Sequence, residues 1–185
     1  MLKTIITFLL LTFAAWSCPF DEADVEVTIM AYNNILKAAN SGDFEKATEE
    51  IRKQKELYEY FEKADKKPLY QPLLNASKNK NAAKIKQLLD RSLILEIKEL
   101  LEKVENNFDK YQKSRLLLIK AKKHLKVLTK DKKAMEYMKN MLKSIGNPGL
   151  MGMGKKASDK KQFLENKNML LKILTSSSKQ SIGST

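Results

Sequence analysis

The recurrence of apolar residues between Ile85 and Leu128 constrains the fold more than any other feature of this 185-residue sequence. Gaps of three, four and seven residues place these side chains on one side of a helix. The first run comprises Ile85, Leu89, Leu93, Ile97, Leu100, Val104 and Phe108. The second run comprises Tyr111, Leu118, Ala121, Leu125 and Leu128. We therefore predict two helices, joined through residues 106–109, that fold back on each other as a hairpin.

Similar spacing elsewhere predicts that the whole chain is helical. Glycine and proline are scarce, at 6 and 4 residues, and no segment alternates as a strand bounded by turns does. We predict an all-α bundle of six to seven amphipathic helices, built from helical hairpins. It spans residues 18–174, and the Ser-rich tail, residues 175–185, is predicted to be disordered because it is too polar to pack.

Helix ends are predicted from capping residues. Asp109 with Gln112, and Asp159 with Gln162, have the spacing of a capping box, in which side chains satisfy free backbone amides. Thr129 is predicted to cap a helix over residues 130–144. These residues set the predicted starts of three of the helices in the second half of the chain.

The break at residues 39–44, Ala-Asn-Ser-Gly-Asp-Phe, resembles the turn of a tetratricopeptide-type helical hairpin. Gly42 is free to adopt the left-handed conformation of a helix C-cap, and Asp43 is a suitable N-cap for the next helix. The resemblance covers about one turn, and it implies a helical hairpin rather than a particular family.

The first residues have the layout of a secretory signal peptide, predicted here over residues 1–17. Lys3 is followed by an uncharged apolar run from Thr4 to Ala15, which is shorter than the roughly 20 residues that span a bilayer. Ala15 and Ser17 are small residues before Cys18, and two processing routes remain open. Cys18 could carry the lipid of a bacterial lipoprotein, as in a lipobox, or cleavage before Cys18 could release a soluble protein. An uncleaved anchor is a third alternative.

The net charge of +13 is concentrated beyond the first third of the chain. Residues 18–60 hold ten acidic and five basic residues, and residues 61–185 hold twelve acidic and 29 basic residues. Such asymmetry favours an anionic partner or an attraction within the chain, although lysine could also simply fill exposed positions. For an exported protein, the partners predicted are a membrane surface, an envelope polymer or an acidic protein. Nucleic acid is disfavoured, since the lysines are not interleaved with aromatic residues.

Methionine supplies the first candidate metal site. The candidate ligands are Met135, Met138, Met141, Met151 and Met153. Outside the cytoplasm, thioether sulfur is a soft ligand for copper(I). The alternative is that these residues fill gaps in a helical core, which is the commoner use of methionine.

Carboxylates supply the second candidate, an iron site formed by the row Glu96, Glu99, Glu102 and Glu105. Bundle metal sites usually add histidine three residues later, which is missing here. We therefore favour a solvated face on which Lys98 and Lys103 pair with these acids. The single histidine, His124, is predicted to be a surface or boundary residue, with a pH-sensing or ligand role as the alternative.

No motif predicts catalysis. The sequence lacks a nucleophile elbow, a phosphate loop, a dinucleotide fingerprint and a metalloprotease motif. The single cysteine excludes an internal disulfide framework. Sequence alone therefore predicts an exported cell-envelope binding protein rather than an enzyme. The alternatives are a periplasmic copper or iron carrier, and a small-ligand carrier with a cavity between hairpins, suggested by the apolar run of residues 116–119.

Overall fold

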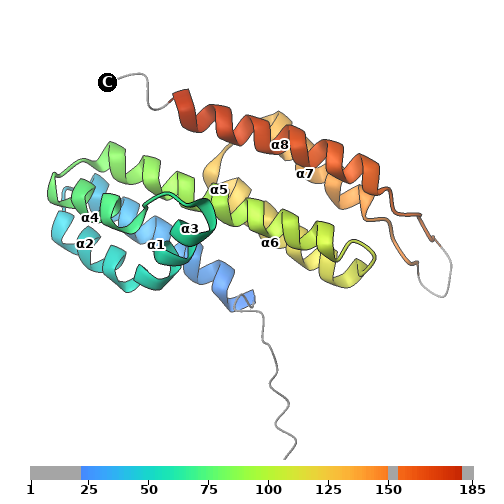
Figure 1. The fold of residues 1–185 in the computed structure, drawn as a ribbon, viewed down its shortest axis with the longest axis horizontal. Coiled ribbons are helices and arrows are strands. Elements are labelled where there is room, and N and C mark those ends of the chain that lie inside the picture. The colour runs from blue at the N-terminus through green and yellow to red at the C-terminus, as the bar shows by residue number, and fades with distance from the viewer. Residues whose placement is uncertain (1–21, 150–153, 181–185) are drawn as a thin grey trace, which may run out of the picture.

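A computed structural model describes residues 22–149 and 154–180, and these ranges form eight α-helices with one isolated β-bridge (Figure 1). The helices are α1 (Glu22–Asn40), α2 (Phe44–Lys53), α3 (Lys55–Asp65), α4 (Tyr70–Lys78), α5 (Ala82–Asn106), α6 (Tyr111–Leu128), α7 (Lys132–Ser144) and α8 (Lys160–Gln180). The all-α prediction is confirmed. The predicted signal peptide and Cys18, Met151 and Met153 lie outside the described residues.

The central hairpin lies where the sequence predicts it. Helices α5 and α6 run alongside each other in Figure 1. Every apolar residue of the first run is buried, from Ile85 to Phe108. In the second run Leu118, Ala121 and Leu125 are buried, and Tyr111 and Leu128 are half-buried. Burial of these stripes is what holds the two helices together.

Two apolar clusters form the core, and α5 contributes to both. The first unites α1 to α4 with the start of α5, and its last buried residue along the chain is Leu93. The second begins at Ile97 and unites the rest of α5 with α6, α7 and α8. A 25-residue helix is about 37 Å long, which is enough to serve two cores end to end. In Figure 1 these clusters correspond to the left and right halves of the molecule.

The eight helices in the described residues exceed the six to seven predicted, because the single helix expected after the Asp43 N-cap is two helices, α2 and α3. Gln54 separates α2 from α3, and its amide bonds back to the Ile51 carbonyl at 3.1 Å. No glycine, proline or capping side chain marks this position. Helix α2 packs on α1 and α4, whereas α3 packs on α4 and α5. The break at Gln54 turns the chain from the α1 side toward α5.

The turn before α2 has the predicted hairpin geometry, and the turn before α5 repeats it. Gly42 has φ of +80°, and Lys80 occupies the equivalent position with φ of +52°. Asp43 and Asn81 then cap the following helices, each accepting from a backbone amide three residues later. In both turns the N-cap amide donates to the carbonyl five residues earlier, at 3.0 and 2.9 Å. These bonds satisfy carbonyls at the helix ends.

Three predicted features near helix ends require correction. Lys110 rather than Asp109 is the N-cap of α6, with no side-chain capping bond, and the Ser114 hydroxyl donates to the Asn107 carbonyl at 2.7 Å instead. Thr129 ends α6, while Asp131 caps α7. The prediction for α8 is confirmed at Asp159, which accepts from the Gln162 amide at 2.9 Å. Helix α8 also continues to Gln180, so residues 175–180 of the predicted disordered tail are helical.

Candidate functional site

The positive charge of the protein resides in one half of the fold. Residues 110–180, which form α6 to α8, contain 19 basic and four acidic residues, a net charge of +15. Residues 22–109 contain 15 basic and 17 acidic residues, a net charge of −2. We call residues 110–180 the basic half. The boundary between the nearly neutral and the strongly basic part of the chain thus lies in the loop before α6, rather than at residue 60 as the sequence suggested.

Lysines in the two halves differ in their partners. On the first five helices, several cations pair with nearby acids, as in Lys53 with Glu50 at 2.7 Å and Lys103 with Glu99 at 2.6 Å, although others have no acidic partner among the described residues. In the basic half the exposed lysines of α7 and of the start of α8 have no carboxylate within ion-pair distance among the described residues. They include Lys132, Lys139, Lys143 and Lys160. Unpaired, exposed cations of one sign create a field that attracts anions.

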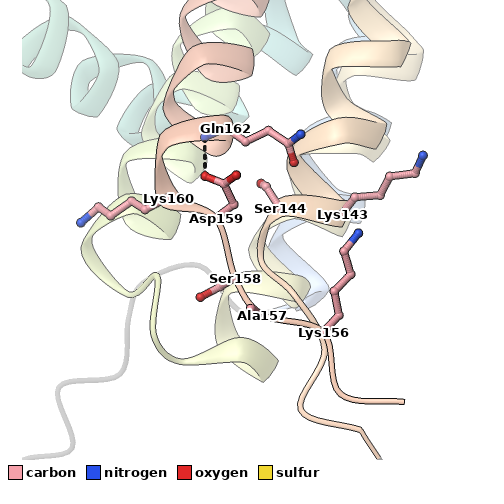
Figure 2. A pocket seen from close by; sticks show the side chains of 8 residues that line it. All are labelled: Lys143, Ser144, Lys156, Ala157, Ser158, Asp159, Lys160 and Gln162. Atoms are coloured by element: carbon pink, nitrogen blue, oxygen red, sulfur yellow. Dashed lines mark hydrogen bonds between the residues drawn. The ribbon is translucent and has the colours of Figure 1, made fainter.

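A polar hollow of about 620 Å³ lies at one end of this half, where α7 ends and α8 begins (Figure 2). Its lining residues are Lys143, Ser144, Lys156, Ala157, Ser158, Asp159, Lys160 and Gln162. In Figure 2 the Lys143 and Lys156 side chains extend to the same side, and Lys160 extends to the opposite side. The Asp159 carboxylate accepts a hydrogen bond from the backbone amide of Gln162, so it caps the start of α8.

Backbone contacts hold the walls of the hollow in place. Asn147 and Lys156 exchange two backbone hydrogen bonds, at 2.9 and 2.8 Å, and the Asp159 amide donates to the Ser144 carbonyl at 2.7 Å. Gly146 has φ of +75°, and a Cβ atom there would lie 2.6 Å from the Lys156 carbonyl oxygen. Glycine is therefore required for the chain leaving α7 to pass so close to the chain entering α8.

A second hollow of about 370 Å³ adjoins the first and shares Lys156, Ala157 and Ser158 with it. Its remaining lining includes the aromatic rings of Phe108 and Tyr111, so it is less polar. The segment 156–158 therefore has a basic polar hollow on one side and a partly apolar one on the other. Neither hollow was predicted from the sequence. The available signals were the glycine-rich break after α7 and the Asp159 cap.

The structure overturns the surface interpretation of His124 and of Glu96. His124 on α6 is completely buried, and Glu96 on α5 is 4% exposed. Their Nε2 and Oε1 atoms are 3.1 Å apart, without the alignment of a hydrogen bond. The other Glu96 oxygen and His124 Nδ1 have no hydrogen-bond partner in the part of the chain that the structure describes. Along α5, Glu96 lies between Leu93, the last buried residue of the first cluster, and Ile97, the first of the second.

The other acids of the Glu row do lie on solvated or half-buried surface. Lys103 pairs with Glu99, and Lys98 lies 3.9 Å from Glu102, as predicted. Glu105 pairs with Lys167 of α8 at 2.5 Å. Glu99 also accepts a hydrogen bond from the Tyr60 hydroxyl at 2.8 Å. Partial burial, and secondarily Glu99, raises the pKa of Tyr60 to about 12. The row is thus divided among separate partners.

The methionines of α7 contribute to packing. Met138 and Met141 are fully buried in the second core cluster, and Met135 packs against it. Their apolar surroundings account for them as core residues. Within residues 22–149 and 154–180, no three His, Cys, Asp or Glu side chains come together as a metal site. The copper and iron alternatives therefore gain no support from the geometry of the described residues.

Comparison of the chain with models of protein families, with curated proteins and with solved structures finds no match. None of the helices in the described ranges combines the length and the apolar character needed to cross a membrane.

Proposed function

We propose that the protein is an exported binding protein that uses its basic half to contact an anionic component of the bacterial cell envelope. The single observation that carries this proposal is the net charge of +15 on residues 110–180, where exposed lysines lack acidic partners. The apolar run before Cys18 supports export and allows lipid attachment at that residue. An envelope location would place the basic half beside anionic headgroups and polymers.

The charge distribution favours this function over the metal carrier. Each lysine near an anionic membrane contributes about 1 kcal/mol to attraction, so several unpaired lysines suffice for binding without a deep pocket. A metal carrier would instead need ligands that converge. Met138 and Met141 are enclosed by apolar side chains, and the row of glutamates is dispersed.

Vesicle binding tests the proposal. We expect the protein to bind vesicles of phosphatidylcholine mixed with phosphatidylglycerol and to bind phosphatidylcholine alone much more weakly. Binding should weaken steeply with salt, because screening shortens the reach of exposed charges to about 10 Å at 0.1 M ionic strength. Salt-insensitive binding, or no preference for the anionic vesicles, would contradict the proposal.

Two matched triple variants test which surface is used. Lys126→Gln, Lys132→Gln and Lys139→Gln remove three exposed charges from the basic half. The control removes three exposed charges from the other half, at Lys37, Lys46 and Lys78. The two proteins have the same net charge. We expect the first triple to lose about tenfold or more in affinity and the control to lose much less. Equal losses would show that net charge alone matters.

A further inference from the structure

We infer that the hollow between the end of α7 and the start of α8 binds a phosphate group of the anionic partner. This inference rests on the proposed function and adds to it a specific contact and a ligand class. The hollow has a volume of about 620 Å³, and its lining is polar. Its volume exceeds that of a phosphate group, so the group can enter together with part of the molecule that carries it.

The cations of the hollow are positioned for one shared anion. Lys143 comes from α7 and Lys156 from the bridge with Asn147, yet both side chains extend to the same side of the hollow (Figure 2). Both are exposed and have no carboxylate partner among the described residues. Two ammonium groups on the same side of one hollow repel each other, and an anion bound there relieves that repulsion.

Neighbouring polar groups favour an oxyanion with several acceptor atoms. The Gln162 side-chain amide lines the same hollow and can donate hydrogen bonds, whereas the Ser158 hydroxyl is directed away from Lys143 and Lys156 (Figure 2). Lysine ammonium groups act as point charges toward phosphate and are common phosphate ligands. The lining contains no arginine, whose planar fork matches carboxylate and phosphate alike. A phosphate suits this lining because its several oxygen atoms can accept from more than one donor at once.

The negative charge in the hollow is separated from these cations. The Asp159 carboxylate accepts the Gln162 amide on the side away from Lys143 and Lys156 (Figure 2). A phosphate is therefore expected on the Lys143 and Lys156 side. The Asn147–Lys156 pairing and the bond from Asp159 to Ser144 fix the walls before binding. A preformed site of this kind loses little conformational freedom when it is occupied.

Two matched pairs of substitutions test the site on the intact protein. Lys143→Gln with Lys156→Gln removes two charges from the hollow. Lys132→Gln with Lys139→Gln removes two charges from α7 residues that do not line it. We expect the hollow pair to lose about tenfold more affinity for phosphatidylglycerol-containing vesicles than the control pair. Equal losses would overturn the inference and leave the proposed function standing.

A titration with inorganic phosphate at constant ionic strength separates the site from the membrane. Amide NMR signals of Ser144, Lys156 and Gln162 should shift and saturate in the unchanged protein and in the control pair, but not in the hollow pair. Inorganic phosphate should then compete with vesicles if the headgroup occupies the same site. Localised shifts without any vesicle binding would support the site, overturn the membrane as its source and point to a soluble phosphate-bearing ligand. Shifts that are uniform, or that persist in the hollow pair, would overturn the site.

Discussion

Glu96 of α5 and His124 of α6 place Oε1 and Nε2 3.1 Å apart in an almost fully buried position between these two helices. Burying either group is costly unless it is paired. We expect His124→Leu to destabilise the protein by about 1–3 kcal/mol, since Glu96 then keeps a buried polar group without the neighbouring imidazole. Urea unfolding of this variant measures the change.

A double-mutant cycle isolates the contribution of the pair. Replacing both Glu96 and His124 by leucine should cost less than the sum of the two single replacements, because no polar group is then left without its partner. Additive costs would show that the two side chains do not interact across the α5–α6 interface.

Alkaline pH should unfold the protein through its buried tyrosines. Burial raises the pKa of Tyr58, and burial together with the hydrogen bond to Asp90 at 2.6 Å raises the pKa of Tyr32. A raised pKa in the folded state contributes stability that is complete below the unfolded value of about 10 and is lost as pH rises through the folded value. The free energy of unfolding should therefore fall above about pH 10.

Ultraviolet absorption of tyrosinate, followed together with circular dichroism, checks this pH dependence. Tyr32 and Tyr58, whose pKa values are raised, should ionise only as helicity is lost. Tyr58→Phe should reduce the loss of stability per pH unit above about pH 10, whereas Tyr60→Phe should change it less, since Tyr60 is 40% exposed. Ionisation of Tyr58 at full helicity near pH 10 would contradict the prediction.

Gly146→Ala should be more damaging than Gly42→Ala. Both glycines have positive φ, at +75° and +80°, so each replacement costs about 1–2 kcal/mol from backbone conformation. A Cβ at Gly42 meets nothing within 4 Å, whereas at Gly146 it meets the Lys156 oxygen at 2.6 Å. Overpacking should add about 1–3 kcal/mol at Gly146. Equal melting temperatures for the two variants would contradict the close approach.

Asp159→Ala should destabilise the protein, whereas Asp109→Ala should not. Asp159 accepts the Gln162 amide at the start of α8, and loss of such a cap costs about 1 kcal/mol. Asp109 makes no capping bond, since α6 begins after Lys110. Thermal unfolding of the two alanine variants compares them directly. A comparable loss of stability in Asp109→Ala would instead support the Asp109 capping box predicted from the sequence.

The sequence identified helices and their buried faces because these depend on local spacing. The stripe from Ile85 to Phe108 is buried throughout, and Phe163, Leu170 and Leu174 form the buried face of α8. Turn residues such as Gly42 and Asp43 acted as predicted, since capping is also local. The same spacing also indicates that Glu96 is buried. Glu96 lies three residues after Leu93 and four before Leu100, which places it on the buried stripe.

Tertiary packing decided the features that depend on which elements meet. Gln54 breaks a segment with no local stop signal, because α2 packs on α1 whereas α3 packs on α5, although both contact α4. Glu96 and His124 are buried because a second helix covers each of them, and the sequence of one helix does not specify its neighbour. The hollow exists because Gly146 lets the chain segments on either side of residues 150–153 approach closely. Helix formation is specified locally, whereas burial of a polar side chain or convergence of two lysines requires segments distant in sequence to come together.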